Sequence, residues 1–271
     1  FVMGIPKTVD NDIAITDHTP GFGSAASFLA ETVREIGADV RSLPIHVCIV
    51  EAMGRNAGWL TAASALAREE PGDAPHLIYL PERPFQEEAF LEDVRQMYEE
   101  KGGVVVVVSE GLRRADNRPI VPLIYSSGRA EYFGDVGAYL AELVIKKLGI
   151  KARSEKPGLL GRASIGTRSE RDVEEAVLVG REAVKAAVEG RTGQMVGLFR
   201  TEDEQGGYEV HTELIPVEEV MLYEKKMPEF FINERGNDVT KEYLDWCGPL
   251  VGDGLEKMLK LEKQEKGEEG R

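Results

Sequence analysis

The chain has 271 residues, a formal net charge of −15 and 42% hydrophobic residues. This length suits one large domain or two small ones with a buried core, and the hydrophobic share excludes a disordered chain. The negative charge argues against nonspecific nucleic-acid binding, which needs clustered lysine and arginine, but a local basic pocket for a small phosphorylated ligand remains compatible with it.

Short apolar runs alternate with amphipathic stretches along the chain. One amphipathic stretch places Ala25, Leu29, Val33 and Ile36 on one face of a helix, and Gly37 is expected to end that helix. In chain order, strands are expected at residues 1–5, 45–51, 76–81, 103–111 and 194–200.

The second half of the chain continues the alternation. Five consecutive valines, residues 104–108, are typical of a strand buried on both faces of a parallel sheet. Further helices are expected before Gly102, before Gly149 and after a capping-box-like start at Ser169 and Asp172. The pattern predicts an α/β fold with a mostly parallel sheet. Residues 260–271 are charged and are expected to form a solvated end.

Cysteine content and hydropathy bear on the cellular compartment. The two cysteines are too few for a disulfide framework, and Cys48 lies in an apolar run as a predicted core residue. They favour a reducing compartment, so a cytoplasmic location is expected. No apolar run approaches about 20 residues and no signal peptide is visible, so no membrane partner is expected.

Polar residues follow the first predicted strand. The sequence GIPKTVDNDI, residues 4–13, places Lys7, Asp10 and Asp12 in the loop after it. Ligands bind at the carboxyl ends of strands in open α/β sheets, where one carboxylate can serve as a base and another can serve a metal or orient a cation. Lys7 can meet a phosphate as a point charge. Alternatively, this segment builds only a turn and a cap.

Two more polar clusters follow predicted strands. In EAMGRNAGWL, residues 51–60, Gly54 allows close approach to a ligand, and Arg55 offers a planar fork to a phosphate or carboxylate. In VVSEGL, residues 107–112, Glu110 can accept hydrogen bonds from sugar hydroxyls. The alternatives are a glycine turn with a surface arginine, and a loop or cap residue. Three clusters at three strand ends are explained more readily as one site.

The motifs GIPKTVDND, MGRNAGW and SEGL, in this order and spacing, resemble those of the phosphofructokinase family from residue 1 to about residue 200. The resemblance implies two Rossmann-like three-layer α/β/α domains with mostly parallel sheets. The first would be incomplete, because the family's glycine-rich donor loops precede its first motif. Residues 1–22 and 161–230 would belong to the phosphoryl-donor domain, residues 23–160 to the sugar-phosphate domain, and residues 231–271 to a C-terminal helix and charged tail.

The resemblance also implies roles for the motif residues. Asp10 would be the proton acceptor, and Thr8 would contact the sugar phosphate. Asp12 would help the metal or arginine network, while Lys7 and Mg²⁺ would neutralise charge on the donor. Asp10 is expected to keep a pKa near the aspartate reference of ~3.9. Four residues are expected to contact fructose 6-phosphate: Met53, Gly54, Arg55 and Glu110. No residue is assigned as a dedicated metal ligand.

Two arginines nine residues apart, Arg153 and Arg162, match family arginines that are directed at the 6-phosphate. A turn between them would bring both guanidinium groups around one phosphate, and the alternative is two solvated arginines in a charged loop. Leu159, counted among the substrate-binding positions, replaces the usual aromatic residue or histidine, and Gly161 replaces a glutamine. His46 stands where many bacterial members have an arginine that reaches a neighbouring subunit, and it is left unassigned.

Lys7 bears on the identity of the donor. In the family, glycine at this position accompanies ATP use, whereas lysine is similar to the pyrophosphate-dependent enzymes. Pyrophosphate has no adenosine, so more of its binding must come from charge near the phosphates. Some ATP-dependent members also carry the lysine, so ATP stays the alternative donor. The resemblance therefore implies a homo-oligomeric, Mg²⁺-dependent enzyme of glycolysis that makes fructose 1,6-bisphosphate from fructose 6-phosphate and pyrophosphate.

Two other functional classes remain open. A non-catalytic regulatory subunit would keep the fold and bind a sugar phosphate as an effector, and a simple sugar-phosphate-binding protein would do so without any turnover. The retention of Thr8, Asp10 and Asp12 argues against the regulatory subunit, because it has no need of a base. Since the donor loops are expected to precede Phe1, the 271 residues alone are expected to show no phosphoryl transfer.

Overall fold

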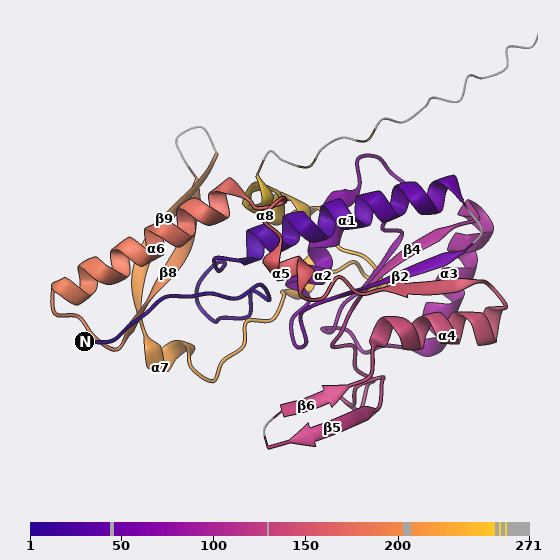
Figure 1. Ribbon diagram of the computed structural model, residues 1–271, viewed down its shortest axis with the longest axis horizontal. Helices are drawn as coiled ribbons and strands as arrows, with labels where there is room; N and C mark the ends of the chain where they lie inside the picture. The colour runs from indigo at the N-terminus through magenta and orange to yellow at the C-terminus, as the bar shows by residue number, and fades with distance from the viewer. Residues whose placement is uncertain (44–45, 129, 203–206, 253–254, 256–257, 259–271) are drawn as a thin grey trace, which may run out of the picture.

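A computed structural model of the chain describes residues 1–43, 46–128, 130–202, 207–252, 255 and 258. The described residues form an elongated molecule with a four-stranded sheet toward one end and a three-stranded sheet toward the other (Figure 1). A separate hairpin projects beside the four-stranded sheet.

The four-stranded sheet is entirely parallel, as predicted for the apolar runs. Its strand order is β3 (Leu77–Tyr79), β4 (Val104–Ser109), β2 (Val47–Ala52) and β7 (Ala152–Glu155). Val47 lies opposite Val104 on one side and opposite Ala152 on the other. Every residue of β2 and β4 is buried, which confirms that the valine run is a central strand.

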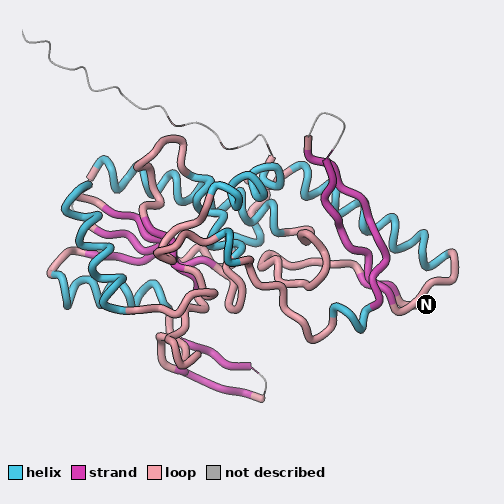
Figure 2. The backbone as a smooth tube through the Cα atoms, turned by 180° about the vertical axis from the view of Figure 1, so that it is seen from behind, coloured by secondary structure: helices cyan, strands magenta, loops and turns pink. Residues whose placement is uncertain are grey.

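Helices cover both faces of this sheet, so it has the predicted three layers. On one face α1 (Phe22–Ser42), α2 (Trp59–Ala63) and α8 (Lys241–Val251) pack around Cys48, Val50, Val105 and Val107. On the other face α3 (Glu87–Lys101) and α4 (Val136–Leu148) pack around the side chains that point the opposite way from the same strands. Seen from behind, the same layers remain distinct (Figure 2).

The prediction that α1 ends at Gly37 is wrong, since the helix continues to Ser42. The reason is packing. A Cβ atom at position 37 would lie 2.7 Å from the Cβ of Ala74, so glycine is needed there for the close approach of the 71–75 turn. Glycine in a helix interior costs only about 1 kcal/mol relative to alanine, and the buried face of α1 outweighs that cost.

The three-stranded sheet differs from the prediction of a second mostly parallel domain. β1 (Met3–Gly4) pairs parallel with β8 (Gln194–Glu202), but β8 pairs antiparallel with β9 (Tyr208–Pro216) over nine residue pairs. α6 (Glu170–Val188) packs against β8 through Val179, Ala183, Val196 and Leu198. A second complete Rossmann-like unit is therefore not seen among the described residues.

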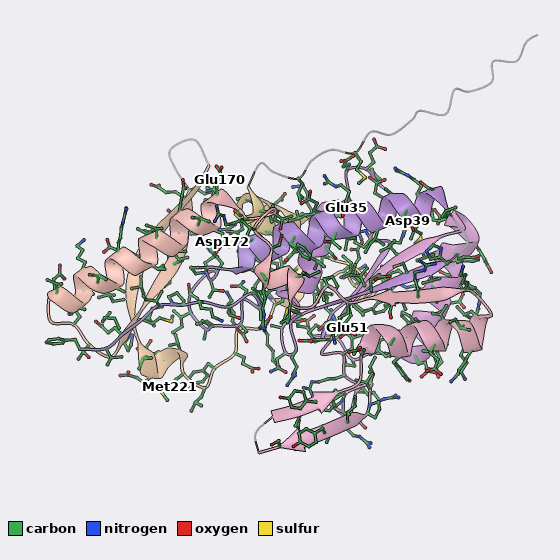
Figure 3. The ribbon with its side chains drawn as sticks, viewed as in Figure 1. Glu35, Asp39, Glu51, Glu170, Asp172 and Met221 are labelled. Atoms are coloured by element: carbon green, nitrogen blue, oxygen red, sulfur yellow. The ribbon has the colours of Figure 1, made fainter. Side chains whose placement is uncertain are left out.

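One carboxylate connects α6 to the start of α1. Ser169 caps α6 by accepting a hydrogen bond from the backbone N–H of Asp172, which confirms the predicted helix start. Asp172 lies near the start of α6 (Figure 3), and its carboxylate in turn accepts hydrogen bonds from the N–H groups of Gly21 and Ser24. These contacts hold the end of the loop that follows β1 between the two sheets.

Several elements were not predicted. The hairpin of β5 (Leu123–Ser127) and β6 (Ala130–Phe133) precedes α4, and β7 and β9 were also missed. Short helical turns are η1 (Ser64–Ala67), α5 (Leu160–Ala163), α7 (Val217–Val220) and η2 (Glu229–Phe231). The predicted C-terminal helix is α8, which packs into the core beside α1, while residues 260–271 lie outside the described residues. None of the described helices has the length and apolar character to cross a bilayer.

Candidate active site

The first motif forms a compact loop between β1 and α1. The Thr8 hydroxyl accepts a hydrogen bond from the Asp10 N–H at 3.1 Å, and Thr19 donates its hydroxyl to the Thr8 carbonyl at 2.9 Å. Asn11 is fully buried and has a φ of 53°, which is a left-handed conformation that asparagine tolerates better than most residues. The loop therefore has a specific shape that an ordinary capping turn does not require.

Asp10 lies among charges that come from all three motifs. Burial raises its pKa to about 6, and the carboxylates of Asp12 and Glu110 contribute to the rise. The guanidinium groups of Arg162 and Arg55 act in the opposite direction. The expectation that Asp10 keeps its reference pKa is thus wrong, because a sequence pattern does not reveal the burial of a loop carboxylate.

Side chains at the end of β4 bind backbone groups of the loop after β2. The Ser109 hydroxyl donates to the Gly54 carbonyl at 2.6 Å, and the Gly54 N–H makes a long 3.4 Å hydrogen bond to Glu110 Oε1. A Cβ atom on Gly111 would lie 1.6 Å from the Arg55 carbonyl oxygen, so only glycine fits there. Arg55 and Glu110 are therefore held side by side, while Met53 packs partly into the core.

Arg55 and Glu110 line a cavity of about 230 Å³ together with Gly111, Arg113 and Tyr132 of β6. The cavity lies at the carboxyl ends of β2 and β4, the position at which open α/β sheets bind ligands. It is lined by both cationic and anionic side chains, which suits a sugar that carries hydroxyl and phosphate groups.

Sequence reasoning missed three charged residues of this cavity, Glu51, Arg113 and Lys156. The Lys156 Nζ lies 2.8 Å from Glu51 Oε1 and 2.5 Å from Asp135 Oδ1, and Glu51 also accepts a hydrogen bond from the Gly137 N–H. These carboxylates raise the pKa of Lys156 against the effect of its partial burial, so it stays a cation. The signal available in the sequence was Glu51, a glutamate within a predicted buried strand, because a buried carboxylate needs a partner.

The two arginines that are predicted to share one phosphate act on different groups among the described residues. Arg162 is exposed on α5, and its charge acts on Asp10. Arg153 lies on β7 beside Cys48, and its charge acts on Cys48 and lowers the pKa of His46, together with burial. Leu159 is 65% exposed next to α5. The described interactions thus bring Arg162 to the motif loops and Arg153 to His46.

The residues present fit the binding of Mg²⁺ together with a phosphate donor. Asp10 Oδ1 is buried and has no hydrogen-bond partner among the described residues, and Asp12 lies close enough to raise the pKa of Asp10. Among the described residues, no cluster of three or more metal-ligating side chains is found. Mg²⁺ does not require one, because it usually binds one or two carboxylates along with substrate phosphates and waters.

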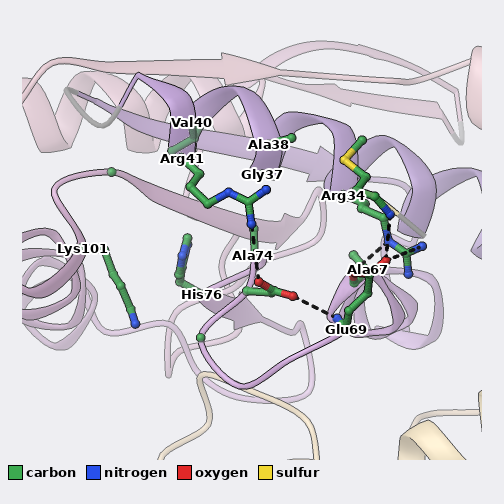
Figure 4. A pocket seen from close by; sticks show the side chains of 14 residues that line it. Arg34, Gly37, Ala38, Val40, Arg41, Ala67, Glu69, Ala74, His76 and Lys101 are labelled. Carbon is green, nitrogen blue, oxygen red and sulfur yellow. Dashed lines mark hydrogen bonds and ion pairs between the residues drawn. The ribbon is translucent and has the colours of Figure 1, made fainter. Parts of the chain in front are cut away.

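A separate cavity of about 420 Å³ lies between α1 and the 69–76 segment (Figure 4). Arg34, Arg41, His76 and Lys101 line it, and none of the residues that line it belongs to the three motifs. The His76 Nδ1 accepts a hydrogen bond from the Val105 N–H, and burial lowers the pKa of His76 to about 4. This cavity is therefore not the site that the motifs form.

Comparison with known proteins establishes the family of the chain. The sequence profile described as "Phosphofructokinase" matches residues 1–187, and the chain belongs to this family. It is 41% identical over 268 residues to a pyrophosphate–fructose 6-phosphate 1-phosphotransferase of Rhodospirillum rubrum, with 95% of this chain and 65% of that protein covered. A sulfofructose kinase of Alkalicoccus urumqiensis is 38% identical, with 92% of this chain and 64% of that protein covered.

A solved structure supports the same assignment. The crystal structure of a pyrophosphate-dependent phosphofructokinase from Marinobacter aquaeolei superposes with a TM-score of 0.81 at 36% identity. The match covers 92% of this chain and 59% of that one. The chain thus spans somewhat less than two-thirds of the length of these relatives.

Proposed function

We propose that the full-length protein transfers a phosphoryl group from pyrophosphate to the 1-hydroxyl of fructose 6-phosphate, giving fructose 1,6-bisphosphate. The observation that carries this proposal is the position of Asp10, a half-buried carboxylate. Its buried Oδ1 has no hydrogen-bond partner in the described part of the chain, and its pKa responds to Glu110, Arg55 and Arg162. A base thereby lies next to the groups that suit a sugar phosphate. The pyrophosphate-dependent relatives support the choice of reaction.

In this mechanism Asp10 accepts the proton of the sugar 1-hydroxyl as that oxygen attacks the terminal phosphorus of pyrophosphate. The bridging P–O bond breaks, and orthophosphate leaves with the bond electrons. The transition state is loose, so the protein contributes mainly positioning and charge. Asp12 would help to hold Mg²⁺, which when bound would supply positive charge to the donor oxygens. Lys7, which is exposed, supplies a further positive charge at the donor side.

The sugar lies in the cavity beside this base. Glu110 accepts hydrogen bonds from sugar hydroxyls. Arg55 and the backbone of Met53 and Gly54 lie beside Glu110, in the loop after β2. Arg162 binds the 6-phosphate. Thr8 holds the base loop and faces the phosphates. Arg153, beside His46, and Leu159 complete the set of proposed substrate contacts.

The proposed setting is a cytoplasmic homo-oligomer acting in glycolysis, with residues 1–22 and 161–230 on the donor side and residues 23–160 on the sugar side. An ATP-dependent enzyme with the same sugar site is the alternative, and a regulatory subunit without turnover is the alternative of another class. A rate assay with each donor distinguishes these two alternatives from the pyrophosphate-dependent enzyme.

The donor is tested by initial rates of the full-length protein with pyrophosphate and with ATP at equal Mg²⁺. We expect pyrophosphate to give the higher rate, and Lys7→Met to lower kcat more than it raises the KM for fructose 6-phosphate, because Lys7 meets charge that develops on the leaving phosphate. Lys151→Met, on the exposed surface before β7, is a matched control that should leave the donor preference unchanged. A strong preference for ATP contradicts the proposal, and turnover with neither donor favours the regulatory subunit.

The pKa of Asp10 predicts an acid limit to activity. Since its carboxylate must be ionised to accept a proton and its pKa is about 6, kcat should fall as the pH drops below about 6. The sign follows from the raised pKa: the working form is lost on acidification earlier than for an ordinary aspartate. The measurement is kcat between pH 5 and pH 8, chosen as roughly one to two units around that pKa.

Glu110→Gln provides the control for this pH profile. The variant removes one of the negative charges that raise the Asp10 pKa, so its acid limb should move to lower pH. Sugar phosphates also titrate near pH 6, but that titration is common to both proteins, and the difference between the two profiles reports on Asp10. Superimposable limbs would show that Asp10 is not the group that titrates.

A further inference from the structure

A segment far from the three motifs in sequence connects two of them in space. Residues 223–227, here called the strap, follow α7 and lie between the loop after β1 and the loop after β2 (Figure 1). On one side the Lys225 N–H donates to the Asp12 carbonyl at 2.8 Å. On the other side Trp59 Nε1 donates to the Lys225 carbonyl at 3.0 Å, and Asn56 donates to Glu224 at 2.8 Å.

The side chain of Lys225 makes three hydrogen bonds, all within the loop after β1. Its Nζ lies 3.0 Å from Asn11 Oδ1, 3.0 Å from the Thr16 carbonyl oxygen and 2.7 Å from the Asp17 carbonyl oxygen. The indole of Trp59 lies 5.0 Å from the same nitrogen. Burial lowers the pKa of Lys225 to about 7, and the ring face attracts its protonated form. Both the backbone and the side chain of Lys225 therefore bind the loop after β1.

The contact with Asn11 is the one that bears on the site. Asn11 stands between Asp10 and Asp12, is fully buried and has a φ of 53°. A non-glycine residue in this conformation costs free energy and persists only where its surroundings hold it. The side-chain amide of Asn11 has its oxygen bound by Lys225 and its nitrogen without a partner among the described residues.

We propose that Lys225 is a positioning residue, whose side-chain nitrogen holds Asn11 in its left-handed conformation and so fixes the directions of the Asp10 and Asp12 carboxylates. The inference rests on the proposed phosphoryl transfer, since it concerns the base of that reaction. Lys225 touches no substrate in this role. It acts through Asn11, and the strap makes that action depend on the loop after β2 as well.

The test compares Lys225→Met with Lys226→Met in the full-length protein. Methionine keeps the length of the side chain but removes the donor. Lys226 is exposed and adjacent, so it is a matched control for loss of one charge from the strap region. We expect Lys225→Met to lower kcat about 10- to 100-fold, because displacement of a catalytic group by about 1 Å can cost that much. The KM for fructose 6-phosphate should change less than about threefold, and Lys226→Met should resemble the wild type.

If Lys225 only stabilised the fold, the result would be different. Lys225→Met would then lower the amount of folded protein, and the surviving folded fraction would show a normal kcat per active site. The thermal midpoint and the stoichiometry of fructose 6-phosphate binding, measured by calorimetry on the same samples, provide the folded fraction by which kcat is divided. A kcat per folded molecule within twofold of the wild type overturns the proposal.

A double-mutant cycle that combines Lys225→Met with Asn11→Ala tests whether Lys225 affects kcat through Asn11. If Lys225 works through Asn11, the double variant should have a kcat close to that of the more damaged single variant, since the second change removes a contact that is already lost. Multiplicative losses in kcat contradict the proposed route. If Lys225→Met does not fold, Asn11→Ala alone decides, because two of the three Lys225 hydrogen bonds remain in it: an unchanged kcat overturns the proposal.

Failure of the proposed reaction is distinguishable from failure of this inference. A wild-type protein that makes no fructose 1,6-bisphosphate with pyrophosphate or ATP refutes the reaction. A wild-type protein that turns over, with Lys225→Met equally active per folded molecule, refutes only the role of Lys225.

Discussion

Replacing Asp10 by asparagine is expected to lower kcat about 10²- to 10⁴-fold, the usual contribution of a general base. The substitution keeps the size of the side chain and most of its hydrogen bonds but removes the proton acceptor. The KM values should change much less, because the sugar and donor keep their other contacts. The measurement is a steady-state assay of the full-length protein with pyrophosphate and fructose 6-phosphate.

Asp39→Asn is the matched control for this experiment. Asp39 is exposed near the far end of α1, well away from the motif loops (Figure 3), so the same chemical change there should leave kcat unchanged. Because the Asp10 pKa is about 6, assays at pH 7 or above compare a wild type in which the base is mostly ionised. Retention of more than a third of the wild-type kcat by Asp10→Asn would exclude Asp10 as the base.

Replacing Arg162 by alanine should raise the KM for fructose 6-phosphate about ten- to hundredfold. A charge-assisted hydrogen bond contributes roughly 1.5–3 kcal/mol, and about 1.4 kcal/mol corresponds to a factor of ten in affinity. The KM for pyrophosphate should be nearly unchanged, because the 6-phosphate lies at the opposite end of the sugar from the reacting hydroxyl. The same measurement on Arg153→Ala tests whether the arginine beside His46 also serves a sugar phosphate.

Arg168→Ala controls for the loss of one positive charge nearby. Arg168 is exposed six residues after Arg162, and its substitution should leave both KM values within about twofold of the wild type. The loss of Arg162 should also raise the pKa of Asp10, because its guanidinium acts to lower that pKa. A normal KM for fructose 6-phosphate in Arg162→Ala would identify this arginine as an ordinary surface residue.

The local patterns in the sequence predicted the parallel sheet well, because burial on both faces leaves an unmistakable apolar run at residues 104–108. They predicted the antiparallel β8–β9 ladder poorly, since only β8 is apolar, whereas β9 alternates exposed and half-buried residues. The β5–β6 hairpin was missed because β5 is exposed along its whole length and has no buried face to set a period.

For the site, too, the sequence predicted the local features but not those that depend on long-range contacts. Motif residues such as Asp10, Arg55 and Glu110 could be named, because they lie near the ends of predicted strands and in motifs that resemble those of the phosphofructokinase family. The raised pKa of Asp10 could not, since it depends on burial and on charges up to 152 positions away in the sequence, at Arg162. The contacts of Lys225 could not be predicted for the same reason, because those with Asn11 and Asp17 span more than 200 residues.

Phosphorus-31 NMR of the full-length protein with fructose 6-phosphate, pyrophosphate and Mg²⁺ tests whether the base loop directs a phosphoryl group of pyrophosphate to the sugar 1-hydroxyl. The Asp10→Asn variant is measured in parallel. We expect a new signal of a sugar 1-phosphate, accompanied by an equal amount of orthophosphate, in the wild type and almost none in the variant. Orthophosphate without sugar 1-phosphate, or equal product from the variant, would contradict this expectation.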